Sequence, residues 1–227
     1  MIRTTVPSPS IPRPRTVLLG LALGVAAATV VTPLHAQELE RPEGWEMRFD
    51  QAGASEADLE QFVEMPPGWH ITTGPAGIFW DPGQDATGTF RLELDVYLFD
   101  PQGRREAFGV FFGGEDLQGP DQRYTYFLVR EGGQFILKER RGSEAPTLQG
   151  WTGHDAVAAY ADRAEGESSV LNRLAVEADE TEVRFFVNDD EVASLPRAEL
   201  LVEGAVGIRV NHALNLHVSR LEVLPLS

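Results

Sequence analysis

Apolar and polar residues alternate along much of this chain with a period of two. The clearest run spans residues 90–99, where Leu92, Leu94 and Val96 alternate with charged or aromatic side chains. Because successive side chains of a strand point to opposite faces, one face of this run is predicted to lie in a core and the other to meet solvent or ligand. Similar runs predict strands at residues 77–80, 106–112, 123–130, 134–140, 172–177, 182–187, 191–195, 205–209 and 215–223. Roughly ten short strands favour an all-β protein built from two packed antiparallel sheets.

The breaks between these runs carry turn-forming residues. Residues 130–134 include Gly132 and Gly133, and residues 187–191 include Asn188; these residue types tolerate positive φ angles. Both segments therefore predict hairpins. Residues 55–62 form the one helix-like stretch, in which Ser55 and Asp58 have the spacing of a capping box at its first turn. Residues 143–169 show little alternation and predict a long excursion between the sheets.

The first 36 residues have the layout of an export signal. Three arginines precede an apolar run at residues 17–31, and the small residue Ala36 stands at the predicted cleavage point. We therefore predict a cleaved signal peptide at residues 1–36 and a single β-sandwich domain at residues 37–227, exported to the periplasm or out of the cell. No second apolar stretch of membrane-spanning length follows. The alternative interpretation is a retained N-terminal anchor.

Charge and cysteine content narrow the classes of function. The chain has a formal net charge of -16, and residues 1–36 hold three of its 19 basic residues and none of its 35 acidic ones, which leaves residues 37–227 at -19. So acidic a protein repels phosphate backbones, which argues against a nucleic-acid partner. The sequence contains no cysteine. Disulfides, thiol catalysis and thiolate metal sites are therefore excluded, and stability has to come from packing.

The last third of the chain carries a family resemblance. It reads Asn-Arg-Leu-Ala-Val at 172–176, Val-Arg-Phe-Phe-Val-Asn at 183–188, Gly-Ala-Val-Gly-Ile-Arg-Val-Asn-His at 204–212, and a final strand at 216–223. This pattern resembles the concanavalin A-like lectin and glucanase superfamily, and within it the 3-keto-disaccharide hydrolase-like family. Asp189 and Ala213 stand where that family commonly has glycine. The resemblance implies a two-sheet antiparallel jelly-roll sandwich whose concave sheet carries a ligand site.

Two carboxylates are candidates for catalysis. Glu93 and Asp95 are two positions apart on a predicted strand, so both project from the same face. Paired carboxylates can act as nucleophile and acid in glycoside cleavage. The Glu-x-Asp core is similar to that of the laminarinase-like glycoside hydrolases, but Tyr97 occupies the position of their second glutamate. The alternative is a solvated strand face on which Arg91 is an ion-pair neighbour.

Aromatic and polar residues suggest a sugar-binding surface. A sugar ring has an apolar C–H face that stacks on aromatic rings, and hydroxyls that need polar partners. His212 lies on the family motif and is the third catalytic candidate, as a general acid or base; the alternative is a satisfied loop histidine. A tryptophan buried in the core is the usual alternative to a stacking platform. The predicted ligand-binding residues are Trp80, Arg91, Tyr126, Arg130 and Trp151.

Cofactors are not demanded by the sequence. The mature histidines have no zinc-site spacing. The loop at 113–121 is rich in carboxylates and glycine, which allows a weak Ca²⁺ hypothesis, but it lacks the alternating acids of a calcium motif and an ordinary acidic loop is favoured.

The leading hypothesis is an exported domain that binds a glycan or glycoconjugate on its concave face. Two alternatives stay open. One is a hydrolase of 3-keto-glycosides, in which His212 or Glu93 would serve as the base. The other is a non-catalytic interaction domain of the cell envelope.

Overall fold

Segments in which apolar and polar residues alternate form β-strands in the structure. The computed structural model describes residues 40–226, so the predicted export signal lies outside the described residues. The strands are β1 (Glu46–Phe49), β2 (Leu59–Glu64), β3 (Trp69–Thr73), β4 (Gly77–Trp80), β5 (Asp85–Ala86), β6 (Phe90–Phe99), β7 (Ala107–Glu115), β8 (Arg123–Arg130), β9 (Gln134–Arg141), β10 (Thr147–Gly153), β11 (Ser169–Ala178), β12 (Glu182–Val187), β13 (Asp190–Pro196), β14 (Gly204–Val210) and β15 (Asn215–Pro225). Three short 3-10 turns, η1 (Glu56–Asp58), η2 (Tyr160–Asp162) and η3 (Arg197–Glu199), complete the described elements. None of the helical turns in this part of the chain has the length and apolar character needed to cross a membrane.

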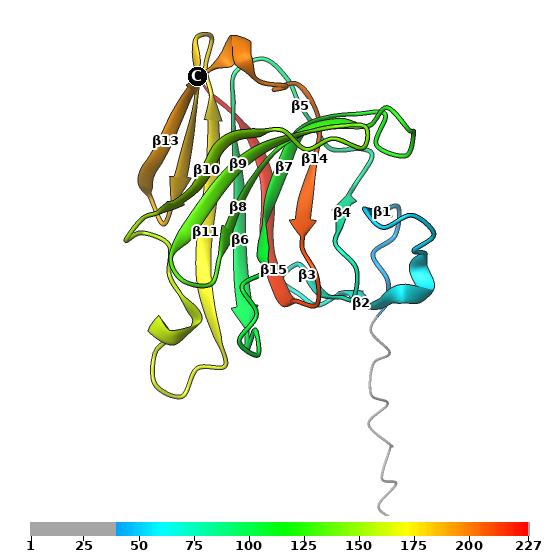
Figure 1. Ribbon diagram of the computed structural model, residues 1–227, viewed down its shortest axis with the longest axis vertical. Coiled ribbons are helices and arrows are strands. Elements are labelled where there is room, and N and C mark those ends of the chain that lie inside the picture. Colours follow the sequence, from blue (N-terminus) through cyan, green and yellow to red (C-terminus); the bar gives the residue numbers. More distant parts are fainter. Residues whose placement is uncertain (1–39, 227) are drawn as a thin grey trace, which may run out of the picture. The chain divides into compact units, whose positions relative to one another are not determined.

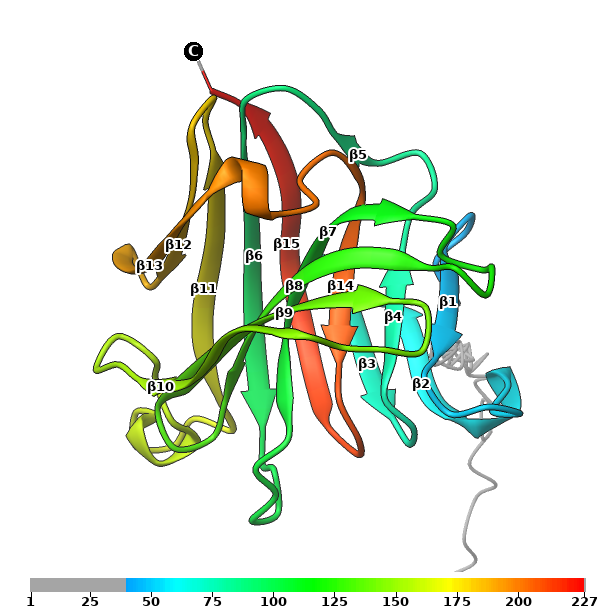
Figure 2. The ribbon, with the colours of Figure 1, turned by 45° about the horizontal axis from the view of Figure 1, so that its top comes forward.

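The strands form two antiparallel sheets that pack face to face (Figures 1 and 2). The eight-stranded sheet has the order β1-β4-β14-β7-β8-β9-β10, with β5 paired to β14. The seven-stranded sheet has the order β13-β12-β11-β6-β15-β3-β2. Figure 2 shows β7, β8 and β9 sweeping across β6 and β11 of the other layer. The predicted two-sheet antiparallel sandwich is confirmed.

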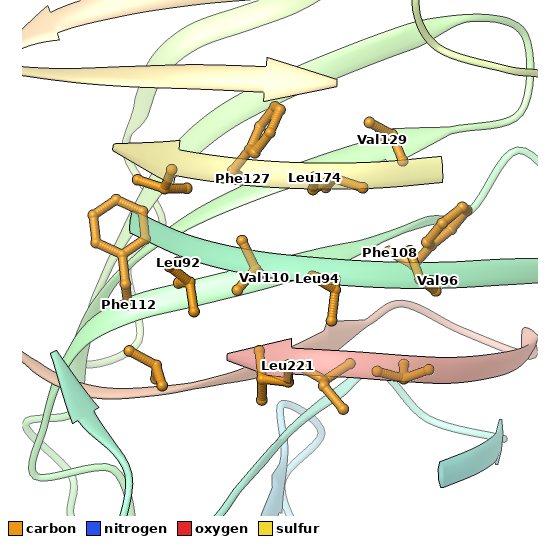
Figure 3. Packing of buried hydrophobic residues seen from close by; sticks show 14 of the residues in the cluster. Leu92, Leu94, Val96, Phe108, Val110, Phe112, Phe127, Val129, Leu174 and Leu221 are labelled. Carbon is orange, nitrogen blue, oxygen red and sulfur yellow. The ribbon is translucent and has the colours of Figure 1, made fainter. Parts of the chain in front are cut away.

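The core lies between the sheets and is built by the period-two pattern. In β6 the four aliphatic residues at 92, 94, 96 and 98 are each at most 2% exposed, while the residues between them are only partly buried. Figure 3 shows this row facing apolar side chains of the other sheet. The labelled members of the cluster are Leu92, Leu94, Val96, Phe108, Val110, Phe112, Phe127, Val129, Leu174 and Leu221. Burial of this continuous apolar surface stabilises a fold that has no disulfide.

All ten predicted strands are present, with ends that differ by at most a few residues. The predicted hairpins are confirmed as β8–β9 and β12–β13. Ser55 and Asp58 do form a capping box, but the turn they cap ends at Asp58 and the chain continues as strand β2, so the longer helical stretch was wrong. The excursion at 143–169 was wrong in part, because it contains β10. Strands β1, β2, β3 and β5 were also missed.

The eight-stranded sheet is strongly curved. Asp50, just after β1, lies 3.9 Å from the guanidinium of Arg140 on β9. These two strands are five positions apart in the sheet, which would be roughly 24 Å in a flat sheet at about 4.8 Å per strand. Only a curved sheet brings their side chains together. We call its outer face, on the hollow side of the curve, the concave face.

Candidate functional site

The concave face has an apolar floor that is separate from the sandwich core. Its side chains alternate with the core residues along the same strands, so they point away from the other sheet. Trp80, Phe111, Tyr124 and Tyr126 form a chain of aromatic contacts across β4, β7 and β8, with ring centroids 5.2 to 6.5 Å apart. Gly207 makes room for this packing, since a Cβ there would lie 2.5 Å from the Phe111 ring. The whole floor consists of Ile78, Trp80, Ala107, Phe111, Leu117, Tyr124, Tyr126, Leu128 and Ile136.

A buried ion pair anchors the middle of this face. The guanidinium of Arg209, on β14, donates to both carboxylate oxygens of Asp50 and, at 3.1 Å, to the hydroxyl of Tyr124. Burial alone would raise the pKa of Asp50, but the hydrogen bond and charge of Arg209, with help from Arg140, hold that pKa below its usual value of 3.8. Burial also raises the pKa of Tyr126 to about 12, so its hydroxyl stays protonated at neutral pH.

The rim of the concave face is polar and accessible. The guanidinium carbon of Arg130, at the end of β8, lies 3.7 Å from the ring centroid of Trp151 on β10. Trp151 is 38% exposed. Gln134 accepts hydrogen bonds from Arg130 through its side-chain oxygen. His212, between β14 and β15, has its Nδ1 3.7 Å from a carboxylate oxygen of Glu106.

Comparison with known proteins identifies the fold. No protein-family model matches the chain, and no curated protein matches it in sequence. Among solved structures, the chain is similar to the carbohydrate binding module CBM66 from Bacillus subtilis, with 11% identity over 80% of this chain and 95% of that one and a TM-score of 0.58. It is also similar to a Bacteroides ovatus mixed-linkage glucan GH16 protein in complex with a G4G4G3G product, with 9% identity over 82% and 97% of the two chains and a TM-score of 0.56. A Bacillus licheniformis beta-glucanase gives 7% identity over 83% and 95% and a TM-score of 0.55. The fold is that of the concanavalin A-like lectins and glucanases.

Within this jelly roll, five of the predicted site residues lie on the concave face or its rim. Trp80 and Tyr126 belong to the floor and are 3% and 5% exposed, so they support the surface and offer little area for stacking. Arg130 and Trp151 contact each other at the rim. His212 lies near Asp50, whose carboxyl pKa its charge helps to lower. The narrower resemblance to the 3-keto-disaccharide hydrolase-like family stays a prediction.

The other three predicted residues are on the opposite side of the jelly roll. Arg91, Glu93 and Asp95 alternate with core residues of β6, so they point outward from the seven-stranded sheet. The sequence-based placement of these residues on one surface with Tyr126 and Arg130 was therefore wrong. The period of two fixes which residues share a face of one strand, but it does not say which sheet that strand joins.

An ion-pair network occupies that outer face. Glu93 accepts from Arg91 at 2.6 Å and also pairs with Arg220. Arg91 bridges onward to Glu177 at 2.6 Å. Arg91 is thus an ion-pair partner of Glu93, as the alternative interpretation of a solvated strand face expects.

Three further features concern metal binding, the 113–121 loop and a pocket. No group of three or more His, Cys, Asp or Glu side chains within residues 40–226 is arranged to hold a metal ion. In the 113–121 loop a carboxylate oxygen of Asp116 accepts from the backbone of Asp121, and Arg48 donates to the carbonyls of Leu117 and Gly119. A pocket of about 550 Å³ opens at the end of the sandwich, between loops that include Asp100, Tyr160 and Asn215.

Sequence reasoning missed the polar residues that organise the concave face. Asp50, Arg105, Gln134 and Arg209 were not singled out, although all four contribute hydrogen bonds there. A signal was present for Arg209, which interrupts the apolar pattern of a strand that is otherwise small or aliphatic. Asp50 gave none, because it lies outside any alternating run.

Proposed function

We propose that this protein is an exported carbohydrate-binding jelly roll that holds a glycan on the concave face. The observation that carries the proposal is the exposed Trp151, stacked on Arg130 at the rim of an apolar floor. An indole offers the flat apolar area on which the C–H face of a sugar ring packs. Gln134, which contacts Arg130, and His212, which lies beside Glu106, supply polar atoms for hydroxyl groups.

Two lines of support converge on this proposal. The concave face combines an apolar floor with a polar rim, which is the composition expected of a small-molecule site. The similar solved structures include a protein named as a carbohydrate binding module and one in complex with a glucan product. A fold alone does not fix a function, so the proposal depends on Trp151 and the residues around it.

The test is calorimetric titration of purified wild-type, W151A and W151F proteins with a panel of soluble oligosaccharides. We expect W151A to weaken binding roughly five- to 150-fold if stacking on the indole contributes as much as the stacking of a nucleobase on an aromatic side chain, which is roughly 1–3 kcal/mol. W151F keeps an aromatic ring and should retain most of the affinity. Matching thermal-unfolding midpoints would show that all three proteins are folded. Equal binding by W151A and wild type would contradict the proposal.

A second candidate function uses the His212–Glu106 contact. A carboxylate beside an imidazole orients the ring and favours its action as a base. Such a base could remove the proton next to the keto group of a 3-keto-glycoside and start its cleavage. Product release from 3-keto-disaccharides that is lost in H212Q would support this function, whereas no release by the wild-type protein would exclude it for these substrates.

A further inference from the structure

Two arginines converge on one neutral oxygen at the rim of the concave face. Arg130 donates its Nε and Nη2 to the side-chain oxygen of Gln134 at 3.1 and 2.7 Å. Arg105, from the segment before β7, donates its Nη2 to the same oxygen at 2.9 Å. An amide oxygen carries only a partial negative charge, so it orients both guanidinium groups without neutralising them.

Neither arginine of this pair forms an ion pair with a carboxylate among residues 40–226; the nearby Glu106 acts on Arg130 only as a more distant charge. Most arginines within residues 40–226 form an ion pair with a carboxylate, but Arg105 and Arg130 do not. Glu106 follows Arg105 in sequence, yet its carboxylate faces His212. The pKa of Arg130 is lowered from its usual value, first by burial and then by repulsion from Arg105, and the charge of Glu106 offsets this only in part. Holding two like charges together is unfavourable unless an anion joins them.

Donor groups remain available for that anion. Nη1 of Arg130 and both Nε and Nη1 of Arg105 have no hydrogen-bond partner among residues 40–226. Trp151 lies against the same Arg130 guanidinium, so a ring packed on the exposed indole would carry its substituents toward these donors. Guanidinium groups match the oxygens of carboxylates and sulfates with paired N–H donors.

We propose that Arg105 and Arg130 recognise an anionic substituent on the bound sugar, a carboxylate or a sulfate ester, so that the ligand class is an acidic glycan. This inference rests on the proposed function of the concave face. A protein of net charge -16 repels acidic polymers in general. A local cationic site would therefore bind only those acidic glycans whose anionic group reaches Arg105 and Arg130.

The experiment compares the full mature protein against neutral, uronate-containing and sulfated oligosaccharides of equal length by calorimetry, at low and high salt. We expect the affinity for one acidic series to be at least about tenfold higher than for the neutral series. This affinity should fall as the salt concentration rises. R105Q, at an exposed position, should remove most of this preference. R123Q removes the same charge from the far end of β8 and should keep it.

The outcomes distinguish failure of this inference from failure of the proposed function. Tighter binding of uronates or of sulfates identifies which oxyanion the arginines read. Neutral and acidic series that bind equally would overturn the inference and leave glycan binding intact. If no oligosaccharide binds, the proposed function fails and this inference fails with it.

Discussion

At the scale of single residues, Arg209 shows what holds the concave face together. Its side chain is almost fully buried, and a buried guanidinium needs paired acceptors. Asp50 supplies both carboxylate oxygens from 159 positions earlier in the chain. The alternating pattern predicted a strand through Arg209 but could not predict this partner. Strand order decides which residues come into contact across such a sequence separation. The local alternation of apolar and polar residues does not reveal strand order.

Removing the partner carboxylate should destabilise the fold. We expect D50N to lower the free energy of unfolding at neutral pH by about 3 kcal/mol, because it leaves the Arg209 charge buried without an anion. Asp50 is itself partly exposed, which puts the value at the low end of the range for buried pairs. Urea unfolding followed by fluorescence measures the difference. E43Q, which removes an exposed carboxylate, is the matched control.

The same pair sets a dependence on pH. The pKa of Asp50 is lower in the folded state than its usual 3.8, so its contribution is fully present above that value and is lost as the pH falls through the folded pKa. The gap in stability between wild type and D50N should therefore narrow below about pH 4. A gap that stays constant down to the acid transition would contradict this role for Asp50.

At the scale of elements, three of the five strands missed by pattern analysis have a common physical feature. β1, β10 and β2 are the outermost strands of their sheets. In β10 every residue is exposed or only partly buried, so neither face selects apolar side chains and no alternation appears. The central strands β6 and β8 were predicted correctly because each has a face that is sealed in the core.

Two turns hold non-glycine residues in a backbone conformation that favours glycine. Asp189 has a φ of 72° and Ala213 a φ of 52°, both in the left-handed region that favours glycine. Glycine would adopt this conformation without steric cost, so the side chains of Asp189 and Ala213 introduce strain here.

Restoring glycine should stabilise the protein. We expect A213G to raise the free energy of unfolding by about 0.5 kcal/mol, and D189G by less because aspartate tolerates this region better than alanine. A193G, on strand β13, should lower it by roughly 0.5–1 kcal/mol. Thermal and urea unfolding of the three variants provide the measurement. If A213G destabilised as much as A193G, relief of strain would not be the dominant effect at Ala213.

At the scale of the whole molecule, the two outer faces have different characters. The outer face of the seven-stranded sheet is covered by paired charges, with Glu93 and Glu177 both joined to Arg91. The concave face has buried aromatics, and the two arginines at its rim form no ion pair within residues 40–226. The sequence-based interpretation selected Arg130 and Trp151, which the structure brings into contact at the rim, and their role in ligand binding stays a prediction. It could not assign the carboxylates of β6 to the right sheet.

This division predicts that carboxylates of β6 do not contribute to glycan binding. In E93Q and D95N we expect the affinity for glycan to stay within about twofold of wild type. The sandwich core separates these carboxylates from the concave face, and distant sites without shared partners act independently. E93Q should instead cost about 1 kcal/mol of stability, since Glu93 pairs with Arg91 and Arg220 at a partly buried position. Calorimetric titration beside W151A, with urea unfolding of each variant, measures both quantities. Loss of binding in E93Q with W151A unaffected would move the ligand site to the seven-stranded sheet, where the ion-pair network would then have to open to admit it.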